Sequence, residues 1–286
     1  EQSFNNCVAF NNTNILFGLV EGVWKNCLTR FSSYLEESLK SITQSTSKTR
    51  EMAKKILKLN YFLKEKNQGT IHLKQNQFNQ VCNFLHLADY CQKEVNTVES
   101  MVIEAIDHDY KQRINLSEER GNFLRVIKTS RDLLVGHMIS SIAPAFDKMI
   151  QSNWRNSPCT EEREYASDIA TLIDYILTQI LEKIPEIYFK PLALSLVISF
   201  ISAFQESIFR LRAVSVEGAH QLQLDNTFLK NYFRTTLPKE KFDPQEIHHF
   251  HKNISSQWSR LDNQLKVLAT QSHQFLQAYK TCMPQK

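Results

Sequence analysis

The chain has 286 residues and a formal net charge of +4 at pH 7, with only six glycines and seven prolines. That length can bury one large core or two ordinary ones, of which two are expected, and so few turn-forming residues favour long helices. The longest uncharged run, residues 191–205, is shorter than the ~20 residues that cross a bilayer. We therefore expect a buried core helix there, with membrane contact only at the surface. Because the first residue is Glu1 rather than Met, the sequence is expected to be part of a longer chain.

Apolar residues recur at spacings of three and four along the first half, which predicts amphipathic helices. The predicted ranges are 13–46, a Lys-rich helix over 48–66, and a helix over 78–106. Ser117, followed by Glu118 and Glu119, is a good N-cap and predicts a helix running towards Pro144 and Trp154.

Residues 156–162 combine turn-forming and charged residues between two helical patterns, which predicts a linker. We expect a first helical bundle over 1–155 and a second over 163–286. Within the second, helices are predicted over about 163–184 and, after a break at Pro185, over the apolar run to about 213. A further helix is predicted to be capped by Ser215 and to end at a loop around Pro238. A last helix is expected to begin at Asp243-Pro244, and its apolar periodicity continues to Tyr279. The prediction is an all-α fold of two tandem bundles that form an elongated rod.

The segment 215–238 carries one polar residue in an unexpected place. On a helical wheel Leu224, Phe228 and Leu229 mark an apolar half, and Asn226 and Lys230 lie on the other half. Gln221 and Asp225 fall inside the apolar half. A buried carboxylate persists only where it is paired, hydrogen-bonded or open to a groove. Asp225 is therefore either a structural lock, bonded by Gln221 and by a Lys, Arg or Tyr of a neighbouring helix, or a recognition point.

Motifs for covalent chemistry are absent from the sequence. It has no Gly-Lys-Ser/Thr loop, no Gly-x-Ser-x-Gly and no His-Glu-x-x-His, so no enzymatic activity and no cofactor are expected. His248, His249 and His251 do not share one helical face and lack a nearby Cys, so polar surface is favoured over a metal site. The six scattered cysteines indicate small buried side chains in a reducing compartment.

Basic residues are concentrated in one segment. Between residues 48 and 66 there are seven Lys or Arg and two Glu, a local charge of +5. Lys54, Lys55 and Lys58 share one side of this predicted amphipathic helix. The side is either a solvated bundle surface or a surface for an anionic membrane or acidic partner. Nucleic acid is not expected, because the patch has no exposed aromatics for stacking.

Four blocks of the sequence resemble one family. Gly218-Ala219, Gln221-Leu222, Leu224-Asp225 and Leu229-Lys230, closing at Leu237-Pro238, resemble the C-terminal region of the vacuolar protein sorting-associated protein 53 family. The stretches Leu87–Cys91 and Arg113–Glu118 and the region of Trp154 resemble that family in the same order. Members are subunits of the Golgi-associated retrograde protein tethering complex.

The resemblance implies helical-rod architecture and a role without covalent chemistry. It implies a cytosolic protein, peripherally associated with trans-Golgi and endosomal membranes, that captures endosome-derived vesicles together with partner subunits and SNARE proteins. This region would be the distal C-terminal leg. We expect the partner contact around Glu217, Gly218, Gln221, Asp225 and Lys230. The alternative is a lipid-binding module that uses Lys54, Lys55 and Lys58.

Overall fold

The structure confirms the all-α class. The computed structural model describes residues 13–57, 71–155, 161–235, 242–271 and 274–282, and these residues form helices joined by turns and short irregular segments. No strand occurs in those ranges.

The chain divides into two compact units. Unit 1 comprises Glu1–Leu134 and Lys183–Pro185, and unit 2 comprises Val135–Glu182 and Glu186–Lys286. Helix α6 (Ser117–Gln151) contributes residues to both units. Most of the linker predicted at 156–162 lies outside the described residues, so that linker stays a prediction.

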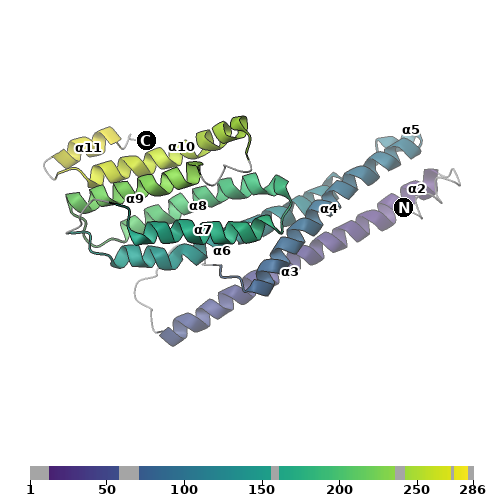
Figure 1. The fold of residues 1–286 in the computed structure, drawn as a ribbon. Helices are drawn as coiled ribbons and strands as arrows, with labels where there is room; N and C mark the ends of the chain where they lie inside the picture. Colours follow the sequence, from purple (N-terminus) through teal and green to yellow (C-terminus); the bar gives the residue numbers. More distant parts are fainter. Residues whose placement is uncertain (1–12, 58–70, 156–160, 236–241, 272–273, 283–286) are drawn as a thin grey trace. The chain divides into compact units, whose positions relative to one another are not determined.

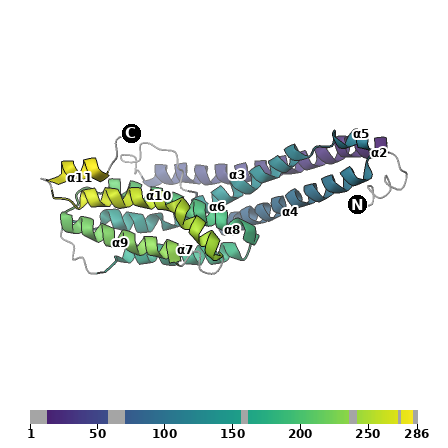
Figure 2. The ribbon, with the colours of Figure 1, turned by 90° about the horizontal axis from the view of Figure 1, so that it is seen from above.

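Unit 1 contains long helices joined to shorter ones (Figures 1 and 2). Its elements are α2 (Thr13–Gly18), the π-helical turn η1 (Leu19–Trp24), α3 (Lys25–Leu57), α4 (Gln75–Ala105), α5 (His108–Lys111) and the first part of α6. Val20, Leu39, Val81 and Phe123 are fully buried in its core. At the start of α2, Thr13 Oγ1 donates to Asp107 at 2.6 Å, which holds α2 against the residues before α5.

Helix α3 is longer than predicted. The sequence predicted that this helix ends near residue 46 and that a second one begins at 48, but α3 continues to Leu57. Its polar residues do not break it, because Ser41, Thr43 and Ser45 each donate a hydroxyl hydrogen bond to a carbonyl three or four residues earlier. A run of Ser and Thr therefore continues as helix instead of forming the expected junction.

The cysteines of unit 1 differ in exposure. Cys82 is fully buried, and burial raises the pKa of its thiol to about 11. Cys27 is exposed, so the expectation of buried cysteines is wrong at that position. The Cys27 side chain points away from the core. Its spacing in the sequence had placed it in the apolar stripe of the helix.

Unit 2 contains helices whose long axes run alongside one another in both ribbon views (Figures 1 and 2). Its elements after α6 are α7 (Glu164–Leu181), the 3-10 turn η2 (Glu186–Tyr188), α8 (Phe189–Phe209), α9 (Val216–Thr235), α10 (Pro244–Leu268) and α11 (Phe275–Cys282). Aromatic rings from α6, α8, α9 and α10 meet in the core: Phe146, Phe200, Phe204, Phe233 and Trp258. The Phe200 and Phe233 centroids are 4.7 Å apart, within the range for favourable aromatic pairs.

Helix α8 is the central core helix that the sequence predicted. The stretch Glu186–Phe209 is apolar and long enough to cross a membrane, with a mean hydropathy of 1.8 over its most apolar window. In the structure, however, Leu192, Leu196 and Phe200 are fully buried by neighbouring helices of unit 2. Its apolar composition is explained by packing in the core.

Helix α10 begins where predicted and ends earlier. The Asp243 carboxylate accepts from the Glu246 N–H at 2.8 Å, and the Glu246 side chain accepts from the Asp243 N–H at 2.9 Å, which forms a capping box. The helix ends at Leu268 instead of continuing to Tyr279. Thr270 donates its hydroxyl to the Lys266 carbonyl at 2.8 Å, so a side chain satisfies a carbonyl of the last turn and the chain leaves the helix.

Candidate functional site

The N-terminus of α9 is attached to one backbone carbonyl. The Trp154 carbonyl accepts from the Ser215 N–H at 3.0 Å and from the Ser215 hydroxyl at 3.2 Å. The same hydroxyl accepts from the Gly218 N–H at 3.0 Å, so Ser215 is the N-cap that the sequence predicted. This arrangement places the start of α9 directly against the residues that follow α6.

Gly218 permits this close approach. A Cβ added at Gly218 would lie 2.0 Å from the Trp154 carbonyl oxygen, well inside van der Waals contact. The obstacle is a backbone atom, which cannot move as a flexible side chain does. The glycine is therefore required by the packing of α9 on the Trp154 carbonyl, since any larger residue would push the helix away.

Asp225 lies about two turns after Gly218 on α9 and is fully buried. Its carboxylate accepts three hydrogen bonds: from the Arg163 N–H at 3.0 Å, the Tyr165 hydroxyl at 2.8 Å and the Gln221 amide at 2.9 Å. The Gln221 amide also donates to the Glu161 carbonyl at 2.7 Å. The predicted bond from Gln221 and the predicted Tyr partner are both present.

The environment of Asp225 is that of a paired buried group. Burial is the largest influence and raises the pKa of the carboxyl above its usual value, while the three donors lower it. Burial and the neighbouring carboxylate also raise the pKa of the Tyr165 hydroxyl well above its usual range. Tyr165 is thus a permanent neutral donor. All three contacts on Asp225 come from within unit 2, which is the geometry expected of a structural lock.

Trp154 completes this cluster. Its indole N–H donates to the Met149 carbonyl at 2.8 Å, and its ring lies in an edge contact with Tyr165 at a centroid distance of 6.4 Å. The Arg163 guanidinium lies 4.0 Å from the Trp154 ring centroid, a cation–π contact. We call Trp154, Arg163, Tyr165, Ser215, Gly218, Gln221 and Asp225 the Asp225 cluster. It joins the end of α6, the start of α7 and the first half of α9.

The structure does not gather the five residues predicted for partner contact into one exposed patch. Gly218, Gln221 and Asp225 are buried in the Asp225 cluster, whereas Glu217 is exposed in the first turn of α9. Hydrogen bonds from its own N–H and from Ser215 lower the pKa of Glu217, which keeps it charged. Lys230 is half-buried and pairs with Asp262 of α10 at 2.5 Å.

The face of α9 that the sequence predicted to be polar is partly buried. Asn226 was put on the polar half, but its side chain is 2% exposed and its amide donates to Asp262 at 2.7 Å. On the opposite side, the Tyr232 hydroxyl donates to Asp174 of α7 at 2.6 Å. Helix α9 therefore packs between α7 and α10, and a wheel drawn for one buried face could not represent two packed faces.

The remaining predicted residues stay apart from this cluster. The side chains of Lys54, Lys55 and Lys58 lie outside the described part of the chain, so their role stays a prediction. Among the residues that the structure describes, no three His, Cys, Asp or Glu side chains are grouped to hold a metal ion. His251 instead bonds the Arg234 carbonyl through Nε2 at 3.0 Å.

Sequence reasoning missed Arg163, Tyr165 and the Trp154 carbonyl as the partners of α9. The only available signal was the buried carboxylate itself, which required donors without indicating where in the chain they lie. The Trp154 region and the segment 215–238, two of the blocks on which the family resemblance rests, are in direct contact in the structure.

The sequence is similar to known proteins, two of which are described here. The chain is 22% identical over 218 residues to vacuolar protein sorting-associated protein 53 A of Arabidopsis thaliana, covering 76% of this chain and 26% of the relative. It is 24% identical over 155 residues to the vacuolar protein sorting-associated protein 53 homolog of Caenorhabditis elegans, covering 53% of this chain and 19% of that protein. The chain thus spans about a quarter or less of their length.

No family model matches the chain, and no solved structure matches it. The similarity to known proteins is therefore a sequence similarity, and in the first relative it extends over three quarters of this chain. These matches confirm that the chain is similar to vacuolar protein sorting-associated protein 53.

Proposed function

We propose that this chain is a non-enzymatic part of a multisubunit vesicle tether that acts in protein sorting. The observation that carries this proposal is the match of 76% of the chain to a vacuolar protein sorting-associated protein. The all-helical structure is compatible with it, because packed long helices provide extended surfaces for other proteins. The residues around Asp225 support a structural role for that cluster and call for no covalent chemistry.

Within this role, the chain acts in retrograde transport from endosomes to the trans-Golgi network, as part of the Golgi-associated retrograde protein complex. It is the C-terminal leg of its subunit, faces the vesicle or the Golgi membrane, and works with SNARE proteins. It is cytosolic and peripherally membrane-associated. In this proposal the chain consists of a first bundle over 1–155, a linker at 156–162 and a second bundle over 163–286, and the second bundle carries the contact surface.

The exposed residues of α9 are the direct contacts in this proposal. Glu217 is charged and exposed at the start of the helix. Lys230, three to four turns further along, is half-buried and paired with Asp262, so only its exposed part is available to a partner. Gly218, Gln221 and Asp225 act indirectly, because they hold the helix that presents Glu217. This division separates residues that a partner touches from residues that only position the helix.

Glu217→Lys in the full-length protein is expected to reduce capture of endosome-derived vesicles about fivefold, the effect of roughly 1 kcal/mol at an exposed charged contact. The unfolding midpoint should stay unchanged, because the side chain is exposed. Vesicle co-sedimentation with the purified tether measures the first quantity, and thermal unfolding measures the second.

The matched control is Glu94→Lys, the same charge change at an exposed position of α4 in unit 1. It should leave vesicle capture at the wild-type level. Equal capture by wild type and Glu217→Lys would remove α9 from the contact surface. Equal losses in both variants would mean that overall charge, not a site, determines capture.

The alternative function is a lipid-binding module, favoured by the local charge of +5 over residues 48–66. In this case replacing Lys54, Lys55 and Lys58 by Gln should abolish binding to anionic liposomes at low salt, and wild-type binding should weaken steeply as salt rises. Liposome flotation with and without anionic lipid measures this. Absence of wild-type binding at low salt would rule the module out.

A further inference from the structure

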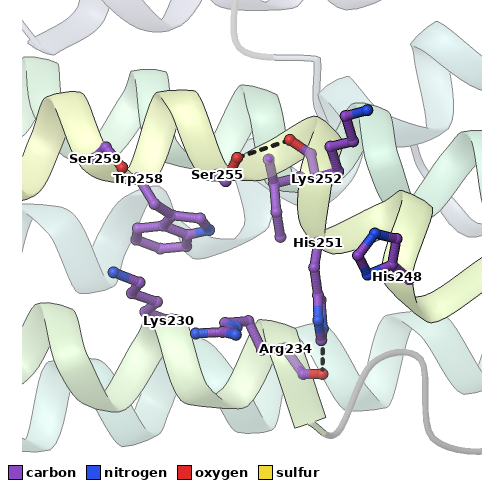
Figure 3. A pocket seen from close by; sticks show the side chains of 9 residues that line it. Lys230, Arg234, His248, His251, Lys252, Ser255, Trp258 and Ser259 are labelled. Carbon is purple, nitrogen blue, oxygen red and sulfur yellow. Dashed lines mark hydrogen bonds between the residues drawn. The ribbon is translucent and has the colours of Figure 1, made fainter.

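A basic groove lies between α9 and α10 on unit 2 (Figure 3). Its volume is about 470 Å³, and none of the nine described residues that line it is acidic. Lys230 and Arg234 enter it from α9, and His251 enters it from α10. His248 and Lys252 also line it, but the Lys252 side chain points away from α9 in Figure 3. The hydrogen bond from His251 Nε2 to the Arg234 carbonyl, 3.0 Å long, connects the two helices across one end of the groove.

The charge inside the groove is not neutralised by the described residues around it. Lys230 is paired with Asp262. Arg234 and Lys252 are exposed, and neither forms an ion pair with any acidic residue in the part of the chain that the structure describes. The three cations that line the groove, less the Asp262 carboxylate, leave a charge of +2, of which the Lys252 charge lies at the rim; neither histidine is counted. A groove with this charge attracts an anion carrying about two negative charges.

A buried donor at the base of the groove has no acceptor. The Trp258 side chain is 1% exposed, and its indole Nε1 has no hydrogen-bond partner among the described residues. The indole points into the space between α9 and α10 (Figure 3). The indole of Trp154, by contrast, donates to the Met149 carbonyl at 2.8 Å. An indole N–H can only donate, and buried donors are normally paired, so Trp258 requires an acceptor that the described residues do not supply.

We propose that this groove binds a phosphate monoester carried by a small polyol, such as an inositol phosphate, either free or as a lipid headgroup. A phosphate monoester carries −1.5 to −2 charges near pH 7 and has three strong acceptor oxygens. Arg234 can bond its oxygens directly, the Trp258 N–H gains an acceptor oxygen, and Lys252 adds positive charge at the rim of the groove. The site lies within unit 2 and does not depend on the proposed tethering role.

The size and lining favour a polyol over a bare ion or a peptide. A volume of about 470 Å³ exceeds what one phosphate group fills and is in the range of pockets for small molecules. Ser255 and Ser259 offer hydroxyl groups at its edge, which can bond the hydroxyls of a polyol. Phosphorylated peptides are recognised by clusters of Arg, whereas Arg234 is the one Arg among the nine described residues that line this groove.

Nuclear magnetic resonance of the ¹⁵N-labelled chain tests this proposal directly. The chain has three tryptophans, so it shows three indole N–H signals, and Trp258→Phe assigns the one from Trp258. Titration with soluble myo-inositol phosphates should shift the Trp258 signal and leave those of Trp24 and Trp154 in place. Vesicles containing phosphoinositide, compared with vesicles of equal charge made with phosphatidylserine, show whether a lipid headgroup serves as well.

Charge-removing variants locate the site. Arg234→Gln should weaken binding of the inositol phosphate about tenfold, because it removes a charge-assisted hydrogen bond. Lys252→Gln should weaken it less, because it removes only a charge at the rim. Arg260→Gln, the same change at an exposed position of α10 outside the groove, should bind as the wild type does.

Three outcomes would overturn the proposal. The first is an unmoved Trp258 signal with every inositol phosphate and phosphoinositide vesicle. The second is equal weakening by Arg260→Gln and by the groove variants, which would indicate non-specific attraction. The third is a Trp258 shift caused by a phosphoserine peptide or by inorganic phosphate alone, with no shift from any inositol compound.

Discussion

Asp225→Ala is expected to lower the free energy of unfolding of unit 2 by about 3–5 kcal/mol, the usual cost of removing one partner from a buried charged network. The variant would remove the acceptor for Tyr165 and for the Arg163 N–H, both of which point to Asp225. It would also leave a small cavity in a fully buried position. Urea unfolding followed by circular dichroism measures the change, and hydrogen exchange of the α9 amides locates it.

Thr227→Ala is the matched control for this variant. Thr227 lies two residues further along α9, is exposed, and bonds only a carbonyl of its own helix, so its replacement should change stability by less than about 0.5 kcal/mol. If Asp225→Ala unfolds like the wild type but loses vesicle capture, Asp225 is a recognition residue instead of a lock. A large loss of stability would show that Asp225 is a structural lock.

Gly218→Ala is expected to destabilise unit 2 by at least about 2 kcal/mol, since overpacking and lost hydrogen bonds both contribute. The added methyl would lie 2.0 Å from the Trp154 carbonyl oxygen. Helix α9 would have to move away, and the two bonds from Ser215 to that carbonyl would break. Thermal unfolding measures the loss, and faster hydrogen exchange in the first turns of α9 would place it at this contact.

The same substitution at another glycine should stabilise the protein instead of destabilising it. A Cβ added at Gly121 in α6 meets nothing within 4 Å, so Gly121→Ala should stabilise the protein by about 0.5–1 kcal/mol through better helix propensity. If both variants were stabilising, the approach of α9 to the Trp154 carbonyl would be looser than the structure shows. The pair therefore separates backbone propensity from packing.

Helix positions were predictable wherever the signal was local. Ser215 and Asp243 cap their helices as expected, because a short polar side chain bonds backbone N–H groups two or three residues away. The apolar segment of α8 was correctly assigned to a core, since its composition leaves no polar face. The errors at the ends of α3 and α10 also have local causes: Ser and Thr side chains bond carbonyls both inside a helix and at its end, so their presence alone does not decide whether the helix continues.

For Asp225, the sequence by itself determined that a carboxylate falls on an apolar helix face and that Gln221 can bond it, because both follow from the helical repeat. Only the tertiary structure decided that the Arg163 N–H and the Tyr165 hydroxyl complete the site, about sixty residues earlier in the chain. Likewise, only the packing of α10 on α9 buried Asn226 and formed the basic groove beside Trp258. Helical periodicity specifies which residues share a face, whereas the partner of that face depends on contacts between segments far apart in sequence.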